Sequence, residues 1–187
     1  KLLLGAAFMW GVIIAGGGAY IINTVLGIGI YIMTGSEGAA EFGTASIVAP
    51  IIEEGLKGLA VLVVFLMFRK EFDSVLDGIV YAAVTAMGFA AIENVLYIFR
   101  GYEAGGWGSF WDLVFVRTIL VGMMHPFFTA FTGIGLAIAR MSRNVLVKII
   151  AVPVGYAVAV TTHAFHNTFG GLIGGLGGLA AGLIADY

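Results

Sequence analysis

The residues from Leu2 to Met33 run for 32 positions without a single charged side chain. About 20 consecutive apolar residues are enough for a helix to cross the hydrocarbon core of a bilayer. The rest of the chain is similar, because 60% of its residues are hydrophobic and only 11% are charged, against roughly 45–50% and 25% in ordinary globular proteins. Such a chain cannot cover a water-facing surface with polar groups. We therefore predict an all-α, multi-pass integral membrane protein that is surrounded by the lipid bilayer.

Charge-poor stretches define about six predicted transmembrane helices. The expected segments are Leu2–Met33, Thr44–Phe68, Val75–Phe99, Leu113–Ala139, Val145–Thr168 and a short, glycine-rich Phe169–Ala185. The first segment is longer than a perpendicular helix needs, so we expect it to tilt or to bend near residues 16–18. No linker or repeat divides the chain. We expect one domain over residues 1–187, with a motif-bearing core at about 44–170.

Basic residues near the ends of the spans predict the orientation of the bundle. If the six segments alternate in direction, six of the nine Lys and Arg residues fall on one side: Lys1, Arg69, Lys70, Arg140, Arg143 and Lys148. Loops rich in Lys and Arg stay in the cytoplasm. The N-terminus is therefore predicted to be cytoplasmic.

Net charge and cysteine content exclude several classes of function. The formal net charge is −2 and the basic residues form no stripe, so nucleic acid is not an expected partner. The absence of cysteine excludes disulfides, thiol nucleophiles and cysteine-ligated zinc or iron–sulfur centres. We expect no nucleotide or flavin cofactor. A metal ion would have to be held by histidine and carboxylate side chains.

Polar residues inside the predicted spans are the main functional signal. A buried ionisable group costs at least about 2.5–3.5 kcal/mol on insertion scales, so each one is expected to have a partner or a function. The set is Glu53, Glu54, Lys57, Glu93, Asn94, Arg117, His125, His163, His166 and Asn167. With a helical rise of about 1.5 Å per residue, these groups lie on four helices in the outer half of the bilayer.

Helical spacing predicts which of these side chains face one another. Glu53 and Lys57 are four residues apart, which predicts an ion pair that leaves Glu54 available for chemistry. His125 shares a face with Thr129, and His163 shares one with Asn167.

For two further polar side chains, His166 and Arg117, the sequence permits more than one position or partner. His166 lies on the His163 face or turns toward the outer interface, and Arg117 either snorkels or pairs with Asp112 or Glu93. Asn94 is expected to be structural.

Four motifs occur in order along these helices. The first, Glu53–Lys57, reads EEGLK, and the second has two parts, DGIVY at Asp77–Tyr81 and GFAAIEN at Gly88–Asn94. The third, His125–Thr129, reads HPFFT, and the fourth, His163–Asn167, reads HAFHN. They resemble the E-E-x-x-K, D-G-x-V-Y … G-F-x-x-x-E-N, H-x-x-x-T and H-x-x-x-N motifs of the PrsW family of intramembrane proteases, which belongs with the CAAX-processing endopeptidases. The resemblance implies an intramembrane endopeptidase in which Glu and His activate water and a His/Asn pair supports the oxyanion.

Two hydrolytic mechanisms fit these residues. Without metal, Glu54 is the general base, His125 orients the water, and His163 and Asn167 donate to the oxyanion. With metal, Glu93, His125 and His163 hold the ion and Glu54 becomes the base. Both remain open, with zinc the favoured metal. The expected catalytic residues are Glu53, Glu54, His125, His163 and Asn167. The expected supporting residues are Lys57, Asn94, Thr129 and His166.

The expected substrate is a membrane-anchored protein. In bacterial members, the resemblance suggests a single-pass anti-sigma factor that is cut near the outer face.

Two other classes of function compete with that of a protease. A proton- or ion-coupled transporter would use the Glu and His residues as a relay across the bilayer. A haem protein would use His125 with His163 or His166 as axial ligands.

Overall fold

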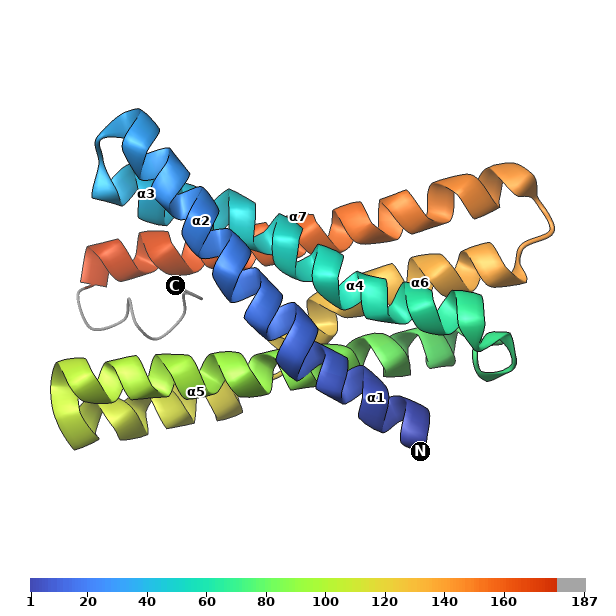
Figure 1. Cartoon of the computed structure of the whole chain (residues 1–187), viewed down its shortest axis with the longest axis horizontal. Coiled ribbons are helices and arrows are strands. Elements are labelled where there is room, and N and C mark those ends of the chain that lie inside the picture. The colour runs from blue at the N-terminus through green and yellow to red at the C-terminus, as the bar shows by residue number, and fades with distance from the viewer. Residues whose placement is uncertain (178–187) are drawn as a thin grey trace.

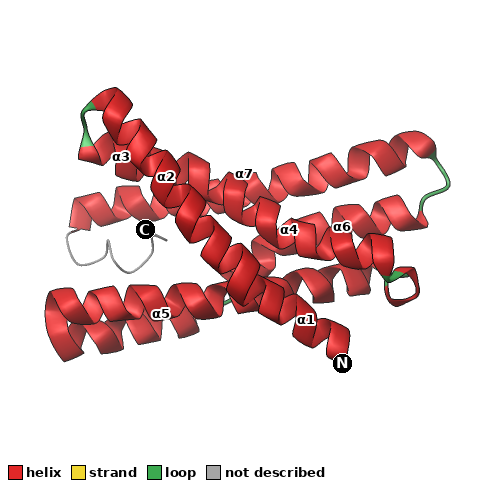
Figure 2. Cartoon of the chain, in the orientation of Figure 1, coloured by secondary structure: helices red, strands yellow, loops and turns green. Residues whose placement is uncertain are grey.

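The computed structural model describes residues 1–177, and all regular secondary structure in that range is helical (Figures 1 and 2). The elements are α1 (Leu2–Trp10), η1 (Gly11–Gly16), α2 (Gly17–Thr34), α3 (Glu37–Gly43), η2 (Thr44–Val48), α4 (Ala49–Met67), η3 (Arg69–Glu71), α5 (Val75–Phe115), η4 (Val116–Leu120), α6 (Met124–Met141) and α7 (Val145–Gly177). Of these, η1, η2 and η4 are π-helical and η3 is a 3₁₀ turn. The all-α prediction is confirmed for the described residues.

Within the described residues, three segments are long and apolar enough to cross a membrane by length and composition: Leu2–Thr34, Val75–Met141 and Val145–Gly170. This supports an integral membrane protein, but it is fewer than the six spans predicted. The helix of the second predicted span carries three charged side chains, and the third and fourth predicted spans form one nearly continuous helical stretch. Of the sixth predicted span, residues 169–177 continue α7, and the rest lies outside the described residues.

The first span is a single long helical segment with an irregular middle. The π-helical η1 joins α1 to α2, close to the bend predicted at residues 16–18. The segment ends at Gly35, whose φ of 66° is the left-handed conformation that commonly terminates helices. In Figure 1, α1 and α2 run diagonally across α4 and α5. This crossing brings residues of α2 over the polar face of α4.

Helix α5 starts sharply and then folds back on itself. Ser74 and Asp77 form a capping box at its N-terminus, in which each side chain satisfies a free backbone N–H group. At Gly106 the backbone leaves the helical region (φ 66°, ψ −153°), and the chain returns alongside the outgoing helix (Figure 1). The returning segment leads through η4 into α6, which α7 follows in the opposite direction.

All the basic connections lie at one end of the bundle. Figure 1 shows the N-terminus, the α4–α5 connection and the α6–α7 connection together, opposite the α2–α3 turn and the tip of α5. Arg140 Nη2 donates to the Arg69 carbonyl over 3.4 Å, which joins two of these connections. The basic residues at these three places therefore lie together, as the alternation of spans predicted.

The apolar core closes this basic end of the bundle. Val61, Val64, Phe72, Tyr81 and Leu136 belong to one buried cluster. Val61 and Val64 follow Lys57 by about one and two helical turns on α4. The buried polar residues of α4 therefore lie on the far side of this cluster from the basic connections.

Close backbone contact between α5 and α6 aligns the two helices. Gly78 and Gly133 face each other so closely that a Cβ atom on either would overlap the backbone of the other. Small residues of this kind let membrane helices approach each other closely. The contact holds His125 of α6 near α4 and α5.

Candidate active site

Glu54 lies at the centre of a buried polar network. Its side chain is fully buried. Oε1 lies 2.6 Å from Lys57 Nζ and 3.1 Å from His163 Nδ1, and Oε2 accepts a 2.8 Å hydrogen bond from Thr129. These contacts join α4 to α6 and α7. One carboxylate thus fixes side chains from three helices.

The predicted ion pair of Lys57 with Glu53 is present, but the expectation that Glu54 stays outside this pair is wrong. Lys57 Nζ lies 2.6 Å from Glu54 but 3.9 Å from the nearest Glu53 oxygen. Residues three apart share a helix face as well as residues four apart do, so spacing alone could not choose between the two. Thr129 and His163 hold Glu54 beside Lys57. Glu53 is therefore the carboxylate that turns away, toward α2.

His125 is oriented by a chain of polar contacts from α5 and η4. Its Nε2 lies 2.9 Å from Glu93 Oε2, and Arg117 Nη2 donates to the same oxygen over 2.6 Å. Arg117 Nε also donates to Asn94 Oδ1 over 2.7 Å. Of the alternatives predicted for Arg117, the structure has the pair with Glu93. The structural role expected for Asn94 agrees with this contact.

His163 and Asn167 lie on the buried face of α7, as their spacing predicted. Both are almost completely buried. The Phe128 ring stacks on the His163 imidazole, with ring centroids 4.9 Å apart. Asn167 Nδ2 donates to the Ala45 carbonyl over 2.9 Å and so ties α7 to η2. The His166 ring lies 5.6 Å from Phe128 at the edge of this cluster.

The predicted convergence of Glu54, Glu93, His125 and His163 agrees with the structure. Glu54 contacts His163, Glu93 contacts His125, and the two imidazole rings have centroids 5.1 Å apart. Lys57 links the two halves, because its Nζ lies 3.2 Å from His125 Nδ1. The four motifs therefore meet at one place in the bundle.

The residues that fit a metal ion differ from the predicted set. Glu53, His125 and His163 each offer one ligand atom, and these atoms all lie within 4.8 Å of one another. This group contains Glu53 where we expected Glu93. The Glu93 carboxylate is bound to Arg117 and to Nε2 of His125. From this position it orients the imidazole ring. Two imidazoles and one carboxylate are a donor set of catalytic zinc sites, so the residues fit a divalent metal.

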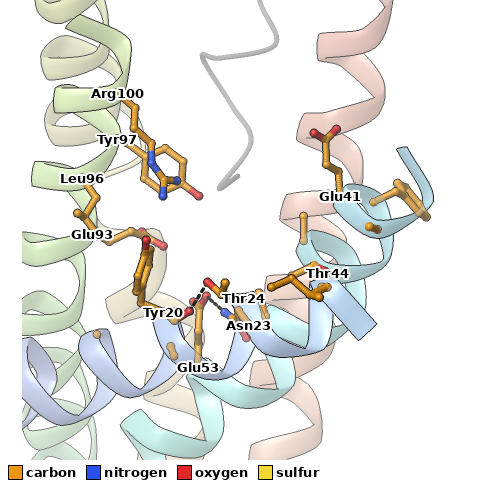
Figure 3. A pocket seen from close by; sticks show the side chains of 18 of the residues that line it. Tyr20, Asn23, Thr24, Glu41, Thr44, Glu53, Glu93, Leu96, Tyr97 and Arg100 are labelled. Atoms are coloured by element: carbon orange, nitrogen blue, oxygen red, sulfur yellow. Dashed lines mark hydrogen bonds between the residues drawn. The ribbon is translucent and has the colours of Figure 1, made fainter. Parts of the chain in front are cut away.

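A cavity of about 720 Å³ opens beside this group, between α2, α3, η2, α4 and α5 (Figure 3). Its polar lining includes Tyr20, Asn23, Thr24, Glu41, Thr44, Glu53, Glu93, Tyr97 and Arg100. At its floor, Asn23 Nδ2 donates to Glu53 Oε1 over 3.2 Å. Glu53 thus reaches the cavity, whereas Glu54 is fully buried and is not part of the lining.

Asn23 is the residue of this site that the sequence analysis missed. It lies in the first span, which contains no charged side chain that would indicate a site. The signal was present, because an amide side chain within an apolar span also needs a hydrogen-bond partner. Its contact with Glu53 extends the site to a fifth helix, α2.

Comparison with known proteins identifies the family of this chain. The model of the PrsW family of intramembrane metalloproteases matches residues 1–185. The chain is 49% identical to Protease PrsW of Clostridioides difficile over 53 residues, which are 28% of this chain and 22% of that protein. It is 31% identical to Protease PrsW of Bacillus subtilis over 107 residues, which are 57% of this chain and 45% of that protein.

The matched regions span less than half the length of these relatives. No solved structure matches the chain significantly. The family match, in contrast, extends over nearly the whole sequence and includes all four polar motifs. By this match, the chain belongs to the PrsW family of intramembrane metalloproteases.

Proposed function

We propose that the chain is an intramembrane endopeptidase that hydrolyses a peptide bond of a membrane-anchored protein at the cavity beside Glu53. The observation that carries this proposal is the position of Glu53. It is the member of the Glu53–His125–His163 group that also lines the cavity. A substrate segment in the cavity would therefore meet Glu53, one of the three side chains that are able to hold a metal ion.

Glu53, His125 and His163 would hold the ion, for which their donor atoms favour zinc. When bound, such an ion would supply Lewis-acid polarisation of the scissile carbonyl and activation of water at neutral pH. The other residues set the positions of these three. Glu93, fixed by Arg117, holds the His125 ring, and Glu54 accepts from His163. Carboxylates that bind the second nitrogen of a metal-ligating histidine fix the orientation of its ring.

These contacts change the roles that the sequence suggested for three residues. We assign the contact with the attacking water to Glu53, because it reaches the cavity, and a positioning role to Glu54, which is enclosed by Lys57, Thr129 and His163. Asn167 donates to the Ala45 carbonyl. This contact supports a role in joining α7 to η2 in place of direct donation to the oxyanion.

We further propose that the chain is one domain with its N-terminus in the cytoplasm. The basic connections would then lie on the cytoplasmic side, and the polar site would lie toward the outer half of the bilayer. A single-pass membrane protein cut near its outer end, of the anti-sigma-factor type, fits this orientation. The buried apolar cluster that includes Val61, Val64 and Leu136 supports this assignment over a transporter, which needs polar groups across the full thickness of the membrane.

Contacts around the two histidines also disfavour haem. Phe128 stacks on His163, and Lys57 and Glu93 contact the two nitrogens of His125. Because an axial ligand must present a ring nitrogen to iron across an open porphyrin face, a haem would have to displace these neighbours.

The proposal is tested by co-reconstituting the chain with a set of tagged single-pass membrane proteins and sequencing the new termini that appear. Cleavage by the wild-type chain, its loss in Glu53→Gln, and its retention in the control Glu37→Gln are expected. Glu37 lies at the start of α3, is exposed, and is absent from the cavity lining. Unchanged cleavage by a folded Glu53→Gln protein would refute the assignment of Glu53.

A further inference from the structure

Lys57 is a fully buried cation in the middle of the proposed metal site. Its Nζ lies 2.6 Å from Glu54 Oε1, 3.2 Å from His125 Nδ1 and 3.9 Å from Glu53 Oε2. The ring of Phe89 lies 4.3 Å from the same nitrogen. An aromatic face attracts a cation, so every one of these neighbours favours positive charge at that point.

The contact with His125 determines which nitrogen of that ring is available. Nε2 lies 2.9 Å from Glu93 Oε2, which accepts hydrogen bonds. An ammonium group only donates, so the contact with Lys57 assigns the acceptor lone pair to Nδ1 and the proton to Nε2. A metal ion would need that same Nδ1 lone pair. Lys57 and a metal ion therefore cannot both bind His125.

We propose that the Lys57 ammonium occupies the cation position of the site and competes with the metal ion for its ligands. The proposal rests on the metal site of the proposed function. Two of the three proposed ligands, Glu53 and His125, lie within 3.9 Å of Nζ. Metal loading must then displace Lys57 from His125. The pair with Glu54 gives the ammonium another partner, so Lys57 can leave His125 and still have a counter-charge.

Two consequences distinguish this role from that of a structural ion pair. First, Lys57 places a positive charge beside Glu53 and Glu54 without metal, so the bundle should not need metal in order to fold. Second, the ammonium lowers the apparent affinity for metal, since a ligand that must displace a competitor binds less tightly. A lysine that only neutralised Glu54 would repel the ion without occupying the lone pair of His125, whereas Lys57 lies 3.2 Å from Nδ1 of that ring.

The test measures Zn²⁺ binding to the detergent-solubilised chain, stripped of metal, in competition with a chromophoric chelator. Lys57→Met keeps the apolar stem and removes the charge. We expect it to bind Zn²⁺ at least about tenfold more tightly than the wild type, an effect of the size that neighbours of metal ligands produce. Lys148→Met removes an exposed lysine at the basic end and should leave the affinity unchanged, and His163→Ala should abolish binding.

Repeating the substitution in a Glu54→Gln variant separates a change in Zn²⁺ affinity from a loss of folding. Lys57→Met leaves the Glu54 carboxylate without its closest cation, which can destabilise the fold. In the Glu54→Gln variant, residue 54 carries no charge, so the same substitution leaves no unpaired carboxylate there. Tighter Zn²⁺ binding on Lys57→Met in both backgrounds supports the proposal. Equal or weaker binding by the folded variants overturns it. If neither the wild type nor any variant binds Zn²⁺, the metal site itself is refuted, and the proposal with it.

Discussion

Replacing Arg117 with methionine removes the cation that holds Glu93 beside His125. The side chains of Arg117 and Glu93 are 5% and 12% exposed, and their charged atoms are 2.6 Å apart. At an effective dielectric constant of about 20, their attraction is about 6 kcal/mol before the cost of desolvation. Removing one partner of a buried pair typically costs about 3–5 kcal/mol, because the other charge stays buried. We expect a loss of stability of about 3 kcal/mol.

The same change should also weaken metal binding, although Arg117 belongs to none of the proposed ligands. His125 would lose the fixed position of Glu93, and such losses typically lower metal affinity about 10–100-fold. Arg117→Lys keeps the charge but loses the Nε bond to Asn94, and it should fall between the wild type and Arg117→Met in both measurements.

The assays are unfolding in mixed micelles and Zn²⁺ titration of the variants that remain folded. Arg143→Met, in the connection between α6 and α7, is the matched control and should change neither quantity. An Arg117→Met protein as stable as the wild type, with unchanged Zn²⁺ affinity, would show that the chain from Arg117 through Glu93 to His125 does not position the site.

Three further predictions concern the site and the topology. Glu54→Gln should abolish cleavage and lower Zn²⁺ affinity about 10–100-fold, because His163 loses its carboxylate partner; normal turnover and affinity would contradict the positioning role. Asn23→Leu keeps the side-chain size but removes the donor to Glu53, so cleavage should fall while global stability, measured by unfolding, changes by no more than about 1 kcal/mol. A cysteine at Ser36 should react with an impermeant reagent from outside, and one at Ser142 only after permeabilisation; the reverse pattern would place the cavity on the cytoplasmic side.

Charge-poor stretches predicted much of the helical architecture. The segment Thr44–Phe68 corresponds to η2 followed by α4, and the third and fifth spans start at Val75 and Val145 as predicted. These boundaries have local causes, such as the capping box at Ser74. The end of the third span was missed, because the helix continues through the polar and glycine-containing residues after Phe99 and reverses only at Gly106.

The residues that make up the site were predictable from the sequence, but the contacts between them were not. The cost of burying charge in lipid identified Glu53, Glu54, Lys57, His125 and His163 one by one. Which carboxylate meets Lys57 depends on the rotation of α4 against its neighbours, and helical spacing permits both. The structure resolves this through contacts from α6 and α7.

The partner of Glu53 depended on an even less predictable feature. Asn23 meets Glu53 only because α2 crosses α4 diagonally (Figure 1). No spacing within a single helix encodes that crossing. Sequence periodicity describes the faces of individual helices, whereas the candidate site is formed where five of them meet.

The reversal of α5 at Gly106 has a consequence for how a substrate is selected. Within the described residues, the two arms of α5 meet in a tight helical hairpin, and α2 is joined to α3 by a short turn at Gly35. These connections provide no long loop with which to grip a folded ectodomain. Recognition would then depend on the segment that enters the cavity, so exchanging the ectodomain of a substrate should leave its cleavage intact, whereas altering the residues around the cut should not.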